Sequence, residues 1–301
     1  MSRRSIALTL AALLLTAACA QQKPKPATRV RASEASASPT TEPTVSPSPA
    51  SPSPAGTPVS LRARTPTPST TAAPTPQPTA GPPAVLVFTL RRGFVHDSVP
   101  AALEALKRLE SHGLPVVHSE DPGVFTDVGL KRFLAVVFLH TTGDVLNGDQ
   151  QAAFERYIRA GGGYAGIHSA ADTEYDWPWY GGLVGAYFKS HPAIQNAKMI
   201  VEKADHPSTS RLPNEWFRTD EWYDFRENPR PKVRVLVTVR EDSYQGGTMG
   251  ADHPVSWCHT YQGGRSWYTS GGHSASAWSE DLFAEHVVGG IRSVARPGFC
   301  V

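Results

Sequence analysis

Runs of apolar residues mark the strands of the folded part of this chain. Residues 84–90 (AVLVFTL) and 134–140 (LAVVFLH) are almost continuously apolar, and residues 115–118 (PVVH) form a short strand-like segment between them. A strand that helices cover on both faces shows no polar alternation, so such runs are typical of a parallel sheet. We therefore expect two buried strands, at residues 84–90 and 134–140, and a further strand at residues 115–118.

Amphipathic segments between these runs predict helices. Ser98 can cap a helix that ends near Gly113 and presents an apolar stripe of leucines, Leu103, Leu106 and Leu109. A second helix is expected over residues 149–160, with Gly161 as its stop. Strands that alternate with helices in this rhythm favour right-handed crossovers in an open parallel sheet.

In the C-terminal third, predicted strands follow one another without helices between them. Residues 232–239, 254–261 and 265–270 have the pattern of strands, the last two forming a hairpin, and residues 278–294 form a closing helix. We therefore predict an α/β fold, with an open, mostly parallel sheet, helices on both faces and C-terminal antiparallel strands.

The first 83 residues do not show this alternation of predicted strands and helices. Residues 1–19 combine two arginines, an apolar run too short to span a bilayer, and the segment TAAC, which together are typical of an export signal. Cys19 after two alanines predicts a lipoprotein, acylated at this cysteine and anchored to the membrane at the bacterial cell surface, with plain secretion as the alternative. Residues 20–83 are rich in Pro, Ser, Thr and Ala and predict a disordered stalk, which leaves residues 84–301 as the folded domain.

Charge and cysteine content narrow the function classes. The 301 residues carry a formal net charge of +2, and the folded part has no long basic run, so nothing points to nucleic acid as a partner. Besides Cys19 the chain has only Cys258 and Cys300, which can form one disulfide in an exported protein, although their spacing alone does not establish it.

Residues 161–172 (GGGYAGIHSAAD) have the pattern of a strand that ends in a sharp turn among small residues. This is the shape of a nucleophile elbow, which holds one side chain exposed at the carboxyl end of a central strand. The side chain at the turn is His168, where acyl-transfer enzymes have a serine or cysteine.

The loop after the first strand offers two more candidates, His96 and Asp97. It lies at a strand carboxyl end, where open α/β sheets bind ligands, so both residues are candidates for substrate binding. In the alternative interpretation Asp97 or Ser98 caps the following helix and His96 is an exposed loop residue.

Two segments combine aromatic rings with carboxylates, as sugar-binding sites do. Trp177 and Trp179 lie in an aromatic-rich stretch near Asp172, and Trp222 follows Asp220 and Glu221. A ring can stack on the C–H face of a sugar while carboxylates accept from its hydroxyl groups. The alternative is that most of these rings pack in the core of the domain.

Four motifs together resemble the ThuA-like (trehalose utilisation) family, which shares the class I glutamine amidotransferase-like, flavodoxin-like fold. They are residues 161–179 (GGGYAGIHSAADTEYDWPW), 190–192 (SHP), 219–223 (TDEWY) and 271–273 (GGH). The resemblance covers roughly residues 84–296 and implies that His273 occupies a late strand end facing the elbow. It also implies a Phe-Arg-His-Asp-Ser pattern in the first loop, in which Val95 replaces the arginine.

The candidate site pairs His168 with His273, to which Glu221 or Asp220, His191, His253 and His96 can be added. Two histidines and a carboxylate, here His168, His273 and Glu221, can hold a divalent metal such as zinc, in which case the imidazole nitrogens should lie roughly 3–4 Å apart. Alternatively the histidines act directly as general acid and base and stand farther apart, with the substrate between them.

The resemblance and the aromatic clusters imply an exported, carbohydrate-active protein. It would act on a glycoside or oxidised sugar by lyase, hydrolase or isomerase chemistry, and the alternative is a non-catalytic module that binds sugar or the cell wall. Glutamine amidotransferase activity is excluded, because that reaction uses a thiolate and the elbow has none. The sequence does not define the oligomeric state.

Overall fold

Nine strands form the central sheet in a computed structural model that describes residues 81–300. Their order is β2-β1-β3-β4-β11-β10-β9-β6-β7. The bounds are β1 Ala84–Phe88, β2 Val116–Ser119, β3 Phe133–Leu139, β4 Gly163–Ile167, β6 Gln195–Val201, β7 Glu215–Asp220, β9 Arg234–Val239, β10 Pro254–Tyr261 and β11 Gly264–Thr269. The predicted export signal, Cys19 and the predicted stalk up to residue 80 lie outside the described residues. Within residues 81–300, no helix has the length and apolar character needed to cross a membrane.

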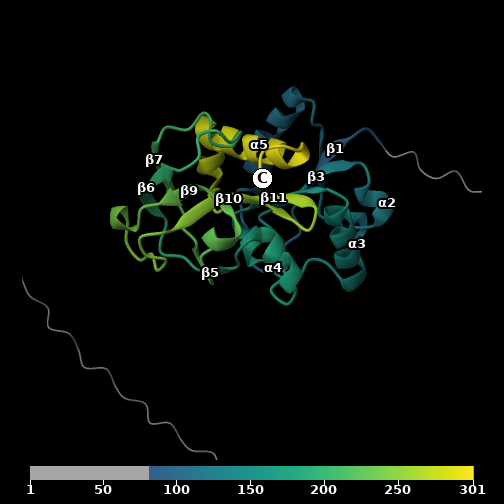
Figure 1. Cartoon of the computed structure of the whole chain (residues 1–301), viewed down its shortest axis with the longest axis horizontal. Helices are drawn as coiled ribbons and strands as arrows, with labels where there is room; N and C mark the ends of the chain where they lie inside the picture. Colours follow the sequence, from purple (N-terminus) through teal and green to yellow (C-terminus); the bar gives the residue numbers. More distant parts are fainter. Residues whose placement is uncertain (1–80, 301) are drawn as a thin grey trace, which may run out of the picture. The chain divides into compact units, whose positions relative to one another are not determined.

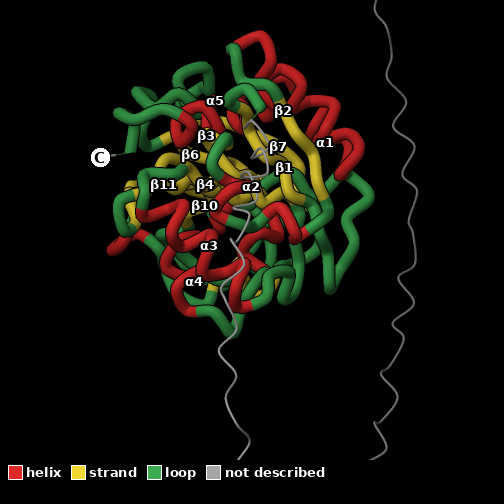
Figure 2. Tube along the Cα trace, turned by 90° about the vertical axis from the view of Figure 1, so that its right-hand side faces the viewer, coloured by secondary structure: helices red, strands yellow, loops and turns green. Residues whose placement is uncertain are grey.

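The sheet has a parallel half and an antiparallel half, as the sequence predicts. β2, β1, β3, β4 and β11 pair in parallel, whereas β11, β10, β9, β6 and β7 pair antiparallel. Helices cover both faces, with α5 on one side and α3 and α4 on the other (Figure 1; Figure 2 gives the perpendicular view). The helices are α1 Val99–Leu106, α2 Asp127–Leu130, α3 Gly148–Arg159, α4 Pro178–Val184 and α5 Asp281–Ala295. The predicted α/β class is confirmed.

Each face of the parallel strands packs its own hydrophobic core. On one face Val137 packs in a cluster with Val287 and Ile291 of α5. On the other face the Phe138 ring lies 5.5 Å from the rings of both Phe154 on α3 and Tyr180 on α4. Because successive strand residues point to opposite faces, the uninterrupted apolar run of β3 supplies both cores.

The secondary structure differs from the sequence prediction in two ways, one in a helix boundary and one in elements that were not predicted. The helix expected from Ser98 to Gly113 is α-helical only over Val99–Leu106 and continues as a 3₁₀ helix over Lys107–His112, ending where Gly113 takes φ +71°. The segment between Trp177 and Phe225 contains structure that the sequence pattern did not predict, namely α4, β6, β7 and a small separate sheet of β5 Phe188–Ser190 and β8 Asp224–Phe225.

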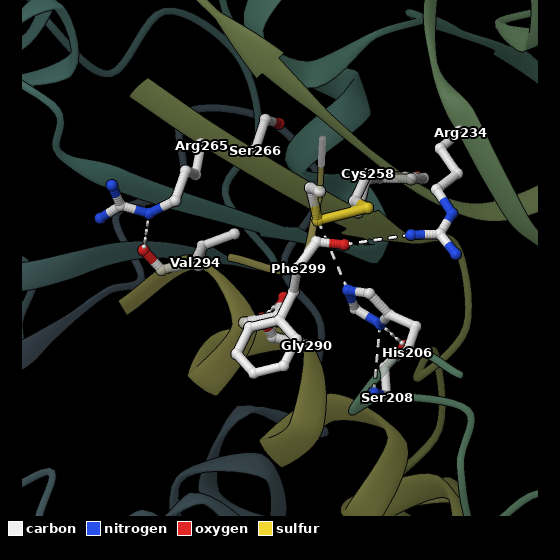
Figure 3. Close-up of a disulfide and its surroundings, with 12 residues drawn as sticks. His206, Ser208, Arg234, Cys258, Arg265, Ser266, Gly290, Val294 and Phe299 are labelled. Atoms are coloured by element: carbon white, nitrogen blue, oxygen red, sulfur yellow. Dashed lines mark hydrogen bonds between the residues drawn. A yellow bond between two sulfur atoms is a disulfide. The ribbon is translucent and has the colours of Figure 1, made fainter. Parts of the chain in front are cut away.

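A disulfide joins Cys258 on β10 to Cys300 beyond the end of α5. The two Cα atoms lie 5.7 Å apart and both cysteines are buried. Figure 3 shows the bond beside His206, with the Arg234 guanidinium donating to the Phe299 carbonyl oxygen (3.2 Å). The pairing that the sequence allowed is therefore present, and it fastens the chain end to the antiparallel half of the sheet.

Candidate metal centre

The elbow after β4 places His168 at the carboxyl end of the parallel strands. His168 adopts φ +54°, a left-handed conformation that is uncommon for a residue with a side chain. The turn needs small neighbours, because a Cβ on Gly166 would lie 2.6 Å from the Tyr164 hydroxyl oxygen. The predicted exposure of His168 is wrong: its side chain has no solvent-accessible surface, since other site residues cover it.

One ring nitrogen of His168 is committed to the backbone. Its Nδ1 lies 2.6 Å from the Ser270 carbonyl oxygen, which can only accept, so Nδ1 carries the hydrogen. In the neutral imidazole, Nε2 therefore presents its lone pair to the site. A histidine that ligates a metal usually has this arrangement, with the distal nitrogen donating to a carbonyl or carboxylate group.

His273 reaches the same point from the loop after β11, and Asp220 holds that loop. The backbone N–H groups of Gly272 and His273 donate to the two carboxylate oxygens of Asp220, at 2.8 and 3.1 Å. The buried Arg218 guanidinium donates to the same carboxylate at 2.8 Å. Asp220 therefore positions His273 and does not face the site as a free ligand group.

Glu221, next along the chain, completes a triangle of donor atoms. Its Oε2 lies 3.2 Å from His273 Nδ1 and 3.4 Å from His168 Nε2, and the two histidine nitrogens are 3.2 Å apart. Ligand atoms bound tetrahedrally to zinc at ~2.0–2.1 Å would be separated by about 3.3–3.4 Å. The three donors thus have the mutual spacing of metal ligands, which is too small to admit a substrate between the histidines.

The electrostatics of this triangle favour an ionised carboxylate. Burial alone would raise the pKa of Glu221, but the neighbouring His168 and His273 side chains together outweigh this effect and hold the pKa well below its usual range. The hydrogen bond to Glu221 raises the pKa of His273 above its usual value. A cation at this site would therefore compete with a proton on His273.

His96 lies buried beside the triangle and is not the exposed loop residue of the alternative interpretation. Its ring centroid is 4.8 Å from that of His168 and 5.1 Å from that of His273, and its side chain is buried. Burial and the two neighbouring histidines lower the pKa of His96 to about 3, which keeps the ring neutral. Asp97 is exposed, and Ser98 occupies the N-cap position of α1 without a side-chain cap.

Two predicted residues, His191 and Asp172, lie at the margin of this site. His191 is partly exposed, and its Nδ1 lies 3.1 Å from Glu221 Oε1. Asp172 ends the short helix that His168 begins; it accepts a hydrogen bond from the Tyr175 hydroxyl group (2.7 Å), and burial raises its pKa.

The predicted tryptophans are not part of the site, and this expectation is corrected. Trp177 donates to Glu155 on α3, and Trp179 donates to Gln262 and packs against Phe154 and Tyr261. Trp222 donates to the Gln195 carbonyl oxygen inside the core. Each indole is used in packing the domain, which is the alternative that the sequence left open.

His253 is also separate from the triangle. Its Nε2 donates to the Tyr223 carbonyl oxygen (2.8 Å), and its Nδ1 lies 2.9 Å from Glu241. It therefore supports the backbone of the segment that carries Glu221.

Three residues of the site were not predicted. His140 follows β3 with φ +52°, is fully buried and stacks on His96 at 4.8 Å. The Tyr223 hydroxyl oxygen lies 3.0 Å from His168 Nε2, and the exposed Phe94 ring lies 4.8 Å from His96. The signal for His140 was its place as the last residue of an apolar run, because strand carboxyl ends meet at the site.

Comparisons with known proteins agree with this fold. A ThuA-like protein of Bacteroides uniformis ATCC 8492 has a TM-score of 0.58 at 22% identity, over 73% of this chain and 95% of that one. A ThuA-like protein of Parabacteroides merdae ATCC 43184 has a TM-score of 0.60 at 19% identity, over 72% of this chain and 91% of that one. No curated protein sequence matches the chain at a significant level. The ThuA family profile, described as trehalose utilisation, matches residues 84–293, and the chain therefore belongs to the ThuA family.

Proposed function

We propose that this protein is a metal-dependent enzyme that acts on a glycoside or oxidised sugar by lyase, hydrolase or isomerase chemistry. The observation that carries the proposal is the spacing of 3.2–3.4 Å among His168 Nε2, His273 Nδ1 and Glu221 Oε2. Two imidazoles and one carboxylate suit zinc and related divalent transition metals. Three protein ligands leave a coordination position open, which is typical of catalytic sites.

The groups behind the ligands fit a metal site as well. The Ser270 carbonyl oxygen fixes the ring orientation of His168, and Asp220 fixes the backbone of His273. Such outer groups orient ligands and are a regular part of metal centres. A divalent cation held there would polarise a sugar carbonyl group or lower the pKa of a water molecule.

Direct acid–base catalysis by His168 and His273 fits the geometry less well. Their nitrogens are 3.2 Å apart, which leaves no room for a substrate between them. His96 is also a poor base near neutrality, because its pKa is lowered to about 3. It is better suited to accept a hydrogen bond from a substrate.

The sugar assignment rests on the family and on the side chains at the rim of the site. The Phe94 ring is 63% exposed, lies nearly parallel to the His273 ring with centroids 6.5 Å apart, and offers an apolar face beside the donors. The exposed Asp97 and partly exposed His191 provide polar groups at the same rim. A stacking face with adjacent polar groups is the combination that sugar sites use.

We also propose that the protein is exported and held at the bacterial cell surface through acylated Cys19, or else secreted. The sequence of residues 1–19 supports export. The disulfide between Cys258 and Cys300 supports it independently, because such bonds persist in oxidising compartments outside the cytosol.

The test is turnover by chelated and metal-reloaded protein. Metal analysis of the purified protein would be followed by assays on trehalose, other disaccharides and their keto-oxidised forms, with His118→Ala on β2 as the control histidine variant. We expect turnover that chelation abolishes and one divalent metal restores, and that is lost in His168→Ala but kept in His118→Ala. Sugar binding without turnover, unaffected by the loss of His168, would instead establish the non-catalytic binding module.

A further inference from the structure

Tyr223 occupies a defined position against the candidate ligand His168. Its phenol oxygen lies 3.0 Å from His168 Nε2, and its ring centroid lies 4.3 Å from those of both His168 and Phe188. The side chain is 3% exposed, and its own carbonyl oxygen accepts a hydrogen bond from His253 Nε2. Ring packing and this backbone bond hold the hydroxyl group in one place.

In the metal-free protein the Tyr223 hydroxyl group is hydrogen-bonded to His168. His168 Nδ1 donates to the Ser270 carbonyl oxygen, so Nε2 of the neutral ring has one lone pair and no hydrogen. His273 Nδ1 lies 3.2 Å from this nitrogen and also 3.2 Å from Glu221 Oε2, and it donates to the carboxylate. The Tyr223 O–H group is then the donor to the lone pair. Within residues 81–300, no other protein atom makes a hydrogen bond to this phenol oxygen.

One lone pair cannot serve both the phenol hydrogen and a cation. If His168 binds a metal through Nε2, the Tyr223 hydroxyl group loses its acceptor in a buried location, where an unmet donor is unfavourable. The phenol oxygen is only 3.0 Å from an atom of the ligand triangle, about the distance that separates the ligand atoms from one another. Its hydrogen is then available to a group that enters the site beside His168.

We propose that Tyr223 is a catalytic residue that donates a hydrogen bond to the substrate oxygen atom at the open position of the site. This inference rests on the proposed metal-dependent function and adds the donor that the ligand triangle itself lacks. A preorganised donor aimed at an oxygen that gains negative charge stabilises it at little reorganisation cost. Tyr223 is then a partner of the substrate and not a fourth ligand.

Tyr223→Phe tests this, because it keeps the ring and removes only the hydroxyl group. The metal probe is Co²⁺, and the oxygen probe is acetohydroxamate, whose binding changes the visible spectrum of the Co²⁺ protein. Tyr187→Phe is the matched control, since it removes a hydroxyl group that donates to the carbonyl oxygens of Glu174 and Trp177. Titrations of both variants and of the unmodified protein, first with Co²⁺ and then with acetohydroxamate, give the affinity for the metal and the affinity for the oxygen probe separately.

We expect Tyr223→Phe to bind Co²⁺ as tightly as the unmodified protein or more tightly, because metal binding no longer breaks a hydrogen bond. Its affinity for acetohydroxamate should fall roughly 5- to 10-fold, the loss expected for one hydrogen bond, while Tyr187→Phe keeps the original affinity. Co²⁺ binding weakened by about tenfold or more would make Tyr223 a ligand and overturn the proposal, as would unchanged hydroxamate affinity. Failure of the unmodified protein to bind Co²⁺ would instead overturn the metal-dependent function on which the proposal rests.

Discussion

At the scale of single residues, Asp220 links the stability of the protein to the geometry of its site. Its carboxylate accepts from Gly272, His273 and the buried Arg218. Asp220→Asn would turn one accepting oxygen into a donor facing other donors and would leave Arg218 without this charge partner. We expect a loss of about 3–5 kcal/mol in the free energy of unfolding, as for other broken buried ion pairs, and a 10- to 100-fold loss of metal affinity, roughly as for lost outer-shell partners. Denaturant titration and calorimetry measure the two effects, and an unchanged metal affinity would contradict the positioning role.

The pair of His273 and Glu221 predicts how the stability of the metal-free protein depends on pH. The pKa of His273 is raised from 6.5, so its contribution is fully present below about pH 6.5 and is lost as the pH rises through the folded-state value. The pKa of Glu221 is lowered from 4.5, so its contribution is lost as the pH falls below about that value. The stability difference between the unmodified protein and His273→Gln, measured in chelator, should therefore peak between these limits and shrink as the pH rises above them. A difference that grows as the pH rises would contradict the pairing.

Strand-end positions and the family resemblance together predicted that His168 and His273 converge, with Glu221 or Asp220 nearby. They did not reveal that His168 is buried, because the groups covering it, Tyr223 among them, come from segments far along the chain. The tryptophans were wrongly predicted to line the site, because an indole next to a carboxylate has the same local sequence pattern in a core as in a sugar site. Trp177 contacts α3 and Trp222 packs in the hydrophobic core, and a local sequence pattern does not predict such tertiary contacts.

At the scale of elements, the apolar segments predicted β1, β2 and β3 and the elbow pattern predicted β4, but β7 was missed. Its burial alternates strictly, yet two of its buried positions hold Arg218 and Asp220 instead of apolar residues. Their charges are compensated by each other and by Glu280, a contact that sequence alone does not show. The polar residues that hid the strand are the ones that position His273.

The packing of α5 on β11 gives a prediction at the same scale. Gly290 lies against the Trp267 ring so closely that an added Cβ would stand 2.2 Å from it. Gly290→Ala should destabilise the protein by about 1–3 kcal/mol or more through overpacking, measured by denaturant titration. Gly148→Ala, at the start of α3 with no atom within 4 Å of an added Cβ, is the matched control and should be neutral or slightly stabilising. Equal effects of the two variants would contradict the close packing.

At the scale of the whole molecule, the disulfide joins the last residues to β10 across 42 positions. In the chain-entropy model a loop of this size contributes about 4 kcal/mol. Cys300→Ser should therefore lower the melting temperature measurably, and unreduced, denatured protein should show no free thiol from Cys258 or Cys300. Two reactive thiols, or an unchanged melting temperature, would contradict the bond.

The central claim is that His168, His273 and Glu221 form one metal site, and calorimetric titration of the metal-free protein with Zn²⁺ tests it most directly. We predict one equivalent bound by the unmodified protein and by His118→Ala, with release of protons because the ligands must be deprotonated. Glu221→Gln should lose more than about 100-fold in affinity, beyond what the loss of an outer-shell group causes. Equal affinity in Glu221→Gln and the unmodified protein, or no zinc binding to the unmodified protein, would contradict the metal site.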